Sequence, residues 1–488
     1  MTAQAPTVHT RLEHDSLGSK AVPAEAYYGI HTVRAVENFA VSGVPISFHP
    51  DFVDALVVVK QAAVVANHQL GLISAERTQA IIAACEEIRD GSLHEHFVVD
   101  AIQGGAGTST NMNTNEVIAN RGLELMGYQR GDYAQLHPLD HVNLGQSTND
   151  AYPTAIKIAL RAQIERLHST MLTLSAAFDS KAIEFRDVLK MGRTQLQDAV
   201  PMTLGQEFGA YAVMVAEDAD RLLEAGRLIA EINLGGTAIG TGLNTHPRYA
   251  ELACSALVDL TGLPLSTASD LVEATQDVGS FVQVSGVLKR TAVKLSKICN
   301  DLRLLSSGPR SGFNEINLPA MQAGSSIMPG KVNPVIPEVV NQVAFEVVGN
   351  DVTITMAAEA GQLQLNAFEP IIAHSLFKSL THLDAACATL IDRCVVGITA
   401  NADRLYDSVT NSIGVITALA PYLGYAESAR IAKIALQAGR SIPDVVLDEG
   451  AMSADQLAEL LRPEVLAHPH DPLAIGSSGR RLSPIGEH

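Results

Sequence analysis

Apolar residues at alternating spacings of three and four dominate the centre of the chain. The first such run follows Pro153, a residue that suits the first turn of a helix. Its apolar positions are Leu160, Ile164, Leu167, Met171, Leu174 and Phe178. This spacing places all of them on one face of an α-helix and is typical of the seam between packed helices. The run predicts a long helix with one buried face.

Two further runs repeat this pattern. One comprises Leu204, Phe208, Tyr211, Val215, Leu222 and Ile229, and the other Phe281, Val284, Leu288, Leu295, Ile298, Leu302 and Leu305, before a stop at Gly308-Pro309. A helix of roughly 30 residues spans about 45 Å, which exceeds what a compact monomeric domain usually needs. We expect two more helices near residues 337–364 and 370–401, and few strands between 150 and 400.

Shorter patterns flank this central bundle. A helical run from Ser74 to Asp90 stops at Gly91, and another covers Ser453 to Leu461. We therefore expect a mainly α protein with three domains. They are an N-terminal, mainly helical domain (residues 1–145), a long-helix bundle (146–403) and a small C-terminal helical domain (404–488) with a poorly ordered tail from about 473.

Composition suggests assembly and excludes two classes of partner. Of the 488 residues, 47% are hydrophobic and only 18% are charged, which favours extra buried surface such as subunit interfaces. The net charge of -19 argues against binding to nucleic acid or an anionic membrane, since both require basic patches. An anionic substrate would need a few placed cations, backbone N–H groups and helix N-termini.

The cysteines and the N-terminus indicate a cytoplasmic protein. The five cysteines are widely spaced and form no CxxC pair, which fits reduced thiols. The N-terminal segment has no apolar core of a signal peptide, and no stretch of about 18 uncharged apolar residues occurs anywhere.

Four polar loops are richer in hydroxyl, amide and glycine residues than a connection requires. They are GGAGTSTNMNTNE (104–116), GQSTND (145–150), GRTQLQD (192–198) and GSSIMPGKVNP (324–334). Each alone reads as an ordinary turn or helix cap. Three of them adjoin the long helices, however, and would gather at helix ends that favour anions, so together they predict a carboxylate site.

Other common sites find no support in the sequence. A P-loop, a GxGxxG after a strand, an HExxH and a GxSxG are all missing. The pairs His137/His141 and His94/His96 are weak metal candidates, for which we favour capping or packing roles.

The segment GSSIMPGKVNP resembles the signature of the fumarase/aspartase superfamily, and the other three loops resemble its remaining active-site segments in the same order. Within that superfamily, EHDSLG, QSTNDAYPTA, LQDAVPMTLGQEF and KVNPVIPEVVNQV are similar to the aspartate ammonia-lyase branch. Fumarases carry histidine after GRT, whereas this chain has Gln195, as some aspartases do.

The resemblance implies reversible elimination of ammonia from L-aspartate to give fumarate, through an aci-carboxylate intermediate. It implies that Ser325 is the general base that removes the Cβ proton. It further implies that Thr108, Ser147, Thr148 and Ser326 stabilise the developing charge, that Lys331 and Asn333 hold the α-carboxylate, and that Asn149, Thr194 and Gln195 orient the α-carboxylate and the amino group.

The resemblance also implies a fold and an assembly. The expected fold is the three-domain fumarase/aspartase fold, whose central five-helix bundles join into a twenty-helix core in a homotetramer with active sites shared between three subunits. No organic cofactor and no catalytic metal are implied, while an activating divalent cation such as Mg²⁺ at a separate site stays open. Two alternatives remain: fumarase or another lyase of the superfamily, and a catalytically silent structural relative.

Overall fold

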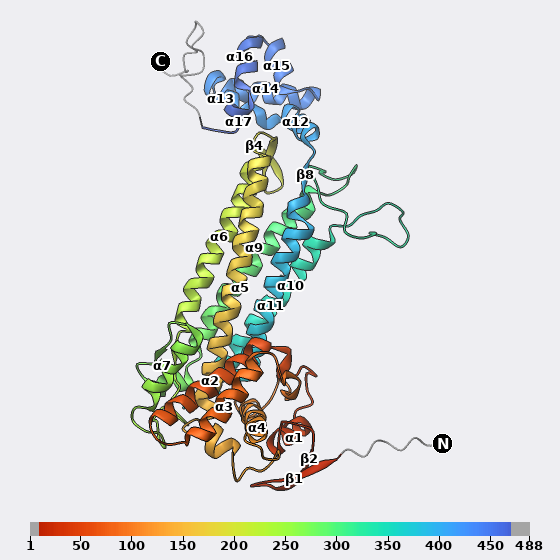
Figure 1. Cartoon of the computed structure of the whole chain (residues 1–488). Coiled ribbons are helices and arrows are strands. Elements are labelled where there is room, and N and C mark those ends of the chain that lie inside the picture. Colours follow the sequence, from red (N-terminus) through yellow and green to blue (C-terminus); the bar gives the residue numbers. More distant parts are fainter. Residues whose placement is uncertain (1–8, 470–488) are drawn as a thin grey trace, which may run out of the picture. The chain divides into compact units, whose positions relative to one another are not determined.

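The computed structural model describes residues 9–469 and is mainly helical (Figure 1). The chain forms two compact units. Unit 1 gathers the residues up to 169 with 218–292 and 343–384, and unit 2 gathers 170–217, 293–342 and the residues from 385 onward. The five longest helices contribute residues to both units. They are α5 (Thr148–Glu184), α6 (Leu204–Leu228), α9 (Gly279–Leu305), α10 (Val335–Glu359) and α11 (Glu369–Arg393).

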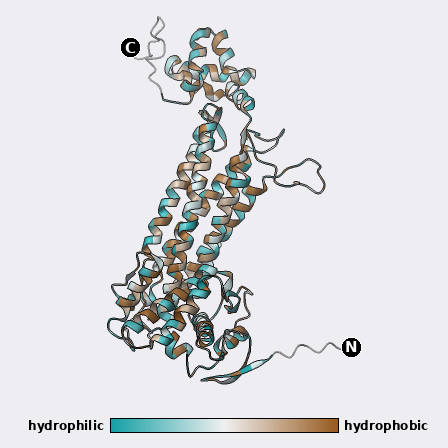
Figure 2. Cartoon of the chain, viewed as in Figure 1, coloured by the Kyte–Doolittle hydropathy of each residue, from teal (hydrophilic) through white to brown (hydrophobic). Residues whose placement is uncertain are grey.

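The residues of the predicted seams lie in the hydrophobic core. All six seam residues of α5 are fully buried, and those predicted with α6 and α9 are 5% exposed or less, although Ile229 follows the last residue of α6. Figure 2 shows the corresponding hydrophobic stretches along the long helices. Two details differ from expectation. Helix α5 begins at Thr148, so Pro153 lies inside it rather than in its first turn, and α10 and α11 end earlier than expected, at Glu359 and Arg393.

Polar and aromatic contacts join neighbouring long helices within each unit. In unit 2, Phe178 of α5 packs against Tyr211 of α6 with ring centroids 5.7 Å apart, and the Tyr211 hydroxyl donates to Asp301 of α9 at 3.0 Å. In unit 1, Ser285 of α9 donates to Asp351 of α10 at 2.8 Å. These bonds fix the rotation of each helix, because a buried polar group is costly unless it is paired.

The rest of unit 1 is built from shorter elements. A hairpin of β1 (Thr10–Asp15) and β2 (Gly18–Pro23) precedes the helices α1 (Ile30–Asn38), α2 (Pro50–Gln69), α3 (Ala75–Arg89) and α4 (Thr108–Leu125). The short 3-10 helices η1 (Ile46–Phe48) and η2 (His94–His96) lie between these helices, and the short π-helix η3 (Pro138–Val142) follows α4. The unit is completed by β5 (Glu231–Ile232), α7 (Tyr249–Thr261), β6 (Ser266–Thr267) and α8 (Leu271–Gln276). The predicted helix at 74–90 is confirmed, with Ser74 as its N-cap.

The rest of unit 2 contains a hairpin and a small helical domain. The strands β3 (Leu189–Thr194) and β4 (Gln197–Thr203) pair antiparallel, and β7 (Ile316–Asn317) pairs with β8 (Thr399–Ala400). The C-terminal elements are η4 (Val395–Gly397), α12 (Ala402–Thr410), η5 (Ile413–Val415), α13 (Ile416–Leu423), α14 (Tyr425–Ala438), α15 (Ile442–Asp448), α16 (Ala454–Leu460) and α17 (Pro463–Leu466). The expected tail from about 473 lies outside the described residues.

The sequence predicted few strands between residues 150 and 400 and a polar loop at GRTQLQD (192–198). The β3–β4 hairpin shows that this segment instead forms two paired strands and a tight turn. Its two turn residues, Gln195 and Leu196, have φ angles of 54° and 63°. A two-residue turn of this kind normally contains Asn-Gly or a similar pair, because both positions require positive φ. With glutamine and leucine there, the usual turn signal is absent from the sequence.

Two other predictions concern the chain as a whole. All five cysteines are buried and none of them forms a disulfide, as expected of reduced thiols. Among residues 9–469, no helix is long and apolar enough to cross a membrane.

Candidate functional site

Thr108 is the first residue of α4 and follows three residues with positive φ. Gly105, Ala106 and Gly107 have φ angles of 91°, 55° and 90°, and a Cβ on Gly107 would lie 2.5 Å from the Tyr152 ring. This packing explains why glycine is required there. The Gln103 side chain accepts from Thr110 N at 3.1 Å and so caps one N–H group in the first turn of α4, while the positive dipole end of the helix favours an anion beside the exposed Thr108.

The residues Ser147, Thr148 and Asn149 form the turn that opens α5, and Asp150 fixes it from inside. The Asp150 carboxylate accepts from Ser147 N at 2.9 Å, Gly235 N at 3.0 Å and Thr237 N at 2.9 Å. Burial raises the pKa of Asp150 to about 6, although these N–H bonds act in the opposite direction. The buried carboxyl thus ties the turn to the segment 233–245.

The sequence did not identify the segment NLGGTAIGTGLNT (233–245) as part of the site. This segment hydrogen-bonds both the side chain and the backbone of Asn149. The side-chain amide of Asn149 donates to Ala238 O at 2.7 Å, and the backbone carbonyl of Asn149 accepts from Asn233 Nδ2 at 3.0 Å. That carbonyl is free because the helical partner four residues on is Pro153, which has no N–H. The glycine cluster in the segment was the available signal.

Thr148 connects this turn to α4. Its hydroxyl oxygen accepts from Asn111 Nδ2 at 3.2 Å, and Asn111 lies one turn after Thr108. Within unit 1 the structure therefore brings Ser147, Thr148 and Asn149 into one turn and joins that turn to the helix that begins at Thr108.

Thr194 and Gln195 lie at the exposed tip of the β3–β4 hairpin in unit 2. Ion pairs hold the base of this tip in place. Glu315, which is 3% exposed, lies 2.5 Å from Arg193 and 2.9 Å from Lys190. Gln195 adopts a positive φ that is unfavourable for a residue with a Cβ, and such strain is often found at functional positions.

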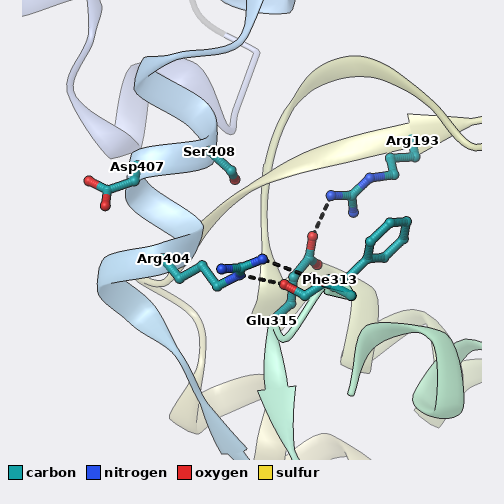
Figure 3. A pocket seen from close by; sticks show the side chains of 7 residues that line it. Arg193, Phe313, Glu315, Arg404, Asp407 and Ser408 are labelled. Atoms are coloured by element: carbon teal, nitrogen blue, oxygen red, sulfur yellow. Dashed lines mark hydrogen bonds and ion pairs between the residues drawn. The ribbon is translucent and has the colours of Figure 1, made fainter. Parts of the chain in front are cut away.

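A cavity of about 340 Å³ lies beside this ion pair (Figure 3). Its lining includes Phe313, whose ring centre is 4.3 Å from the Arg193 guanidinium, and Arg404 of α12. Arg404 donates to Phe313 O at 2.6 Å and to Gly312 O at 2.8 Å. Arg193 of the hairpin and Arg404 of α12 thus both contact the segment 312–315.

The loop GSSIMPGKVNP closes on itself around Ser325. The Ser325 hydroxyl oxygen accepts from the backbone N–H groups of Ile327 at 3.2 Å and Met328 at 2.9 Å. Gly324 N donates to Lys331 O at 2.9 Å, and a Cβ on Gly324 would lie 2.3 Å from that oxygen. Only glycine therefore permits this closure.

The remaining predicted residues of the loop differ in their contacts. Asn333 donates to Gly324 O at 2.6 Å, so its amide closes the loop, while Ser326 and Lys331 are exposed. The loop thus presents a serine oxygen with two N–H donors, and it carries an exposed lysine six residues further along the chain. This combination can stabilise negative charge on that oxygen.

The histidine pairs have the capping and packing roles that we expected. His137 Nδ1 accepts from Leu139 N at 3.1 Å, His141 Nδ1 accepts from His137 N at 2.8 Å, and His94 lies 2.9 Å from Ile88 O. His96 packs edge-on against Tyr27. In the described part of the chain, no group of three or more His, Cys, Asp or Glu side chains is placed to hold a metal ion.

Comparisons with known proteins find matches along nearly the whole chain. A family described as "Lyase" matches residues 18–349, and "Fumarase C C-terminus" matches residues 415–468. An aspartate ammonia-lyase of Pseudomonas aeruginosa is 58% identical over 466 residues, which cover 95% of this chain and 98% of that protein.

Solved structures share the fold. A Brucella melitensis protein described as "fumarate lyase:delta crystallin", bound to cobalt, has a TM-score of 0.93 and 54% identity, over 94% of this chain and all of that one. A class II fumarase from Schistosoma mansoni has a TM-score of 0.90 and 35% identity, over 95% of this chain and all of that one. The helices, the four loops and these matches lead to one conclusion: the chain belongs to the fumarase/aspartase superfamily of lyases.

Proposed function

We propose that this protein is a carbon-nitrogen lyase that eliminates ammonia reversibly from L-aspartate to give fumarate. The observation that carries the proposal is the Ser325 hydroxyl, whose oxygen accepts two backbone N–H bonds inside the GSSIMPGKVNP loop. The 58% identity to an aspartate ammonia-lyase, against 35% to a fumarase, supports aspartate as the substrate.

The reaction requires a strong base held close to a dianion. The Cβ proton of aspartate is scarcely acidic, so Ser325 must act as an alkoxide. In this proposal the two N–H groups and the positive charge of Lys331 in the same loop stabilise that form. The proton moves from Cβ to Ser325 Oγ, and the electron pair moves onto the adjacent carboxylate as an aci-carboxylate. The pair then returns to form the C=C bond as the C–N bond breaks and ammonia leaves.

The other predicted residues bind the substrate in this proposal. Thr108, Ser147, Thr148 and Ser326 donate to the carboxylate that gains charge, and one well-placed donor of this kind contributes about 3 kcal/mol. Lys331 and Asn333 hold the α-carboxylate. Thr194, Gln195 and Asn149 orient the α-carboxylate and the amino group.

We also propose a homotetramer in which each active site takes loops from three subunits. Phe345, Val352 and Met356 of α10 share one helix face and are 65%, 56% and 67% exposed in the single chain. An apolar stripe of this kind indicates a partner helix. A second copy of the same bundle would cover it and build the twenty-helix core.

The cofactor and the location of the protein are proposals as well. The chemistry above uses side chains and backbone only, so we propose that no organic cofactor and no catalytic metal are needed, and that an activating cation such as Mg²⁺ would bind elsewhere. Activity after chelator treatment, with and without added Mg²⁺, tests both points. Five cysteines without a disulfide fit the reducing cytoplasm, and the net charge of -19 fits a protein without nucleic-acid or membrane partners.

The function is tested by following the absorbance of fumarate from two starting compounds. We expect the full chain to form fumarate from L-aspartate and not from L-malate, with Ser325→Ala as the inactive control. Turnover of L-malate alone would instead identify a fumarase. Failure with both compounds in a folded protein would favour another lyase or a silent relative.

The shared site is tested by mixing two inactive variants. Ser325→Ala and Asn149→Ala chains are unfolded and refolded together in equal amounts. If one site draws these loops from different subunits, roughly a quarter of the sites in random closed assemblies receive both intact loops. We expect activity near that fraction. Mixed tetramers without recovered activity would contradict the shared site and leave the lyase assignment standing.

A further inference from the structure

Lys60 is a fully buried lysine whose charge the proposed mechanism does not use. It lies in α2 within the apolar stretch LVVVKQAAVV and is 1% exposed. An ammonium ion removed from water costs several kcal/mol unless other groups compensate for the lost hydration. A fold that retains such a residue must provide partners for it.

The three hydrogen-bond partners of the Lys60 ammonium are neutral amide oxygens. Its Nζ donates to Asn111 Oδ1 at 2.5 Å, Asn143 Oδ1 at 2.9 Å and Gln146 Oε1 at 2.9 Å. All three donor positions of the ammonium are thus satisfied without a carboxylate. The charge is solvated by dipoles but is not neutralised by any of them.

Few ionisable groups face Lys60 from the elements around α2. The groups whose charge acts on Lys60 are Asp150 of α5 and Cys85 of α3. Asp150 is the only carboxylate in that set, and backbone N–H groups already occupy both of its oxygens. When Lys60 is protonated, its positive charge therefore remains largely unbalanced within the described part of unit 1.

Lys60 determines which way the Asn111 amide faces. In its charged form Lys60 can only donate, so the amide oxygen of Asn111 must then point to Lys60. Its Nδ2 then donates to Thr148 Oγ1 at 3.2 Å and to Asn143 Oδ1 at 3.2 Å. Because a lone pair of Thr148 accepts this bond, the hydroxyl hydrogen of Thr148 is left to donate to another group.

We infer that Lys60 is a positioning residue for the proposed reaction. It acts through Asn111 to make Thr148 a hydrogen-bond donor to a substrate carboxylate, and it supplies the buried positive charge that the dicarboxylate balances. This inference rests on the proposed function and on Thr148 as a substrate-binding residue. Lys60 itself touches no substrate, because the amides of Asn111, Asn143 and Gln146 surround its ammonium.

Charge balance predicts that a proton is taken up when a dicarboxylate binds. Burial lowers the pKa of Lys60 to about 7, so at pH 8 most molecules without ligand have a neutral Lys60. A bound dianion favours the charged form and raises this pKa. Asp150, with its pKa near 6, stays ionised at pH 8, and the Cys85 thiol, whose pKa burial raises, stays protonated.

The test measures proton uptake during binding. Full-length Ser325→Ala protein cannot turn over, and succinate provides a C4 dianion without an amino group. Calorimetric titrations at pH 8 in two buffers of different ionisation enthalpy give the number of protons bound per site. We expect net uptake of up to about 0.9 proton, because about nine in ten Lys60 groups are neutral at pH 8 before binding. Succinate binding without proton uptake would overturn the inference, and this measurement needs no substitution of Lys60.

Variants in the same background separate charge from packing. Lys60→Met should abolish proton uptake and weaken succinate binding about 10-fold or more, because charge and amide orientation are both lost. Lys60→Arg keeps a permanent charge, so binding should be closer to the parent while uptake is absent. The exposed Lys433→Met is the matched control and should leave both quantities unchanged.

The outcomes distinguish this inference from the proposed function. Equal proton uptake in Lys60→Met and its parent, with circular dichroism showing that both are folded, would assign the proton to another group. L-aspartate turnover by the unsubstituted chain is measured separately. Normal turnover combined with absent uptake refutes the role of Lys60 alone, whereas absent turnover of L-aspartate refutes the proposed function.

Discussion

The turn at 145–150 and the loop at 324–334 carry similar residues but are held in different ways. In the turn, the buried Asp150 accepts three backbone N–H groups, two of which come from the segment 233–245. In the loop, the hydrogen bonds of Ser325 and Asn333 stay within the loop itself. Its Ile327 is 83% exposed, which is unusual for an isoleucine.

This difference suggests a division of labour. A turn fixed by buried partners provides a preorganised surface for carboxylates, since its donors do not need to rearrange. A loop that closes on itself and exposes apolar side chains depends on neighbouring structure for its final position. Substitutions in the loop should therefore affect chemistry with little effect on stability, and substitutions beneath the turn should affect both.

Ser325→Ala should produce the largest effect. It removes the base and leaves the backbone donors of the loop in place, so kcat should fall by about a thousand-fold or more. The melting temperature should stay within about a degree, because the hydroxyl is bonded only inside the loop. Initial rates of fumarate formation and calorimetric melting give both quantities. Activity within ten-fold of the unsubstituted protein would mean that another group is the base.

Gly324→Ala should reduce kcat by about a hundred-fold, with Gly330→Ala as its control. A Cβ on Gly324 would meet Lys331 O at 2.3 Å and break the closure that orients Ser325. Gly330 has a φ of 80° but nothing within 4 Å of its added Cβ, so alanine there costs only about 1 kcal/mol of backbone strain. Steady-state rates should separate the two variants. Equal losses would show that backbone freedom matters rather than closure.

Asp150→Asn should lower kcat by about ten-fold and alter the pH dependence of stability. The asparagine oxygen can replace one carboxylate oxygen, but its NH₂ group then faces a backbone N–H, and the turn loosens. The folded pKa of Asp150 is about 6, above the ordinary value of 3.8, so the folded protein binds more protons between these values.

Stability of the unsubstituted protein should therefore fall as the pH rises from about 4 to about 6, by up to about 1.4 kcal/mol per pH unit from this group. The Asp150→Asn protein lacks this contribution. Urea unfolding at a series of pH values, with protein concentration held constant, gives the difference between the two curves. Parallel curves would mean that Asp150 titrates normally in the folded protein.

The sequence predicted the features that repeat or that form long motifs. The seams of α5, α6 and α9 are confirmed because spacings of three and four specify a buried helical face whatever the partner is. The loops at 104–116, 145–150 and 324–334 were found because hydroxyl, amide and glycine residues gather there beyond the needs of a turn. Their roles in catalysis remain predictions.

The features that were missed depend on contacts between distant segments. The β3–β4 hairpin lacks the usual turn residues, so only its pairing with buried neighbours reveals it. The segment 233–245 gains its meaning from Asp150, more than 80 residues earlier. Lys60 did offer a signal, because a lysine inside an apolar run must find partners, but the sequence could not identify Asn111, Asn143 and Gln146 as those partners.

Leu196→Asn should have the smallest effect and tests whether the hairpin tip is strained. Leu196 has a φ of 63° and is 66% exposed, so its side chain gains little from packing while its backbone occupies an unfavourable region. Asparagine tolerates this region better than leucine, and the exchange should raise the free energy of unfolding by a few tenths to about 1 kcal/mol. Because Thr194 and Gln195 are unchanged, kcat should stay within about two-fold. Urea unfolding and initial rates measure the two quantities. A loss of stability would show that the leucine side chain contacts something, and in an assembled tetramer that contact would be with another subunit.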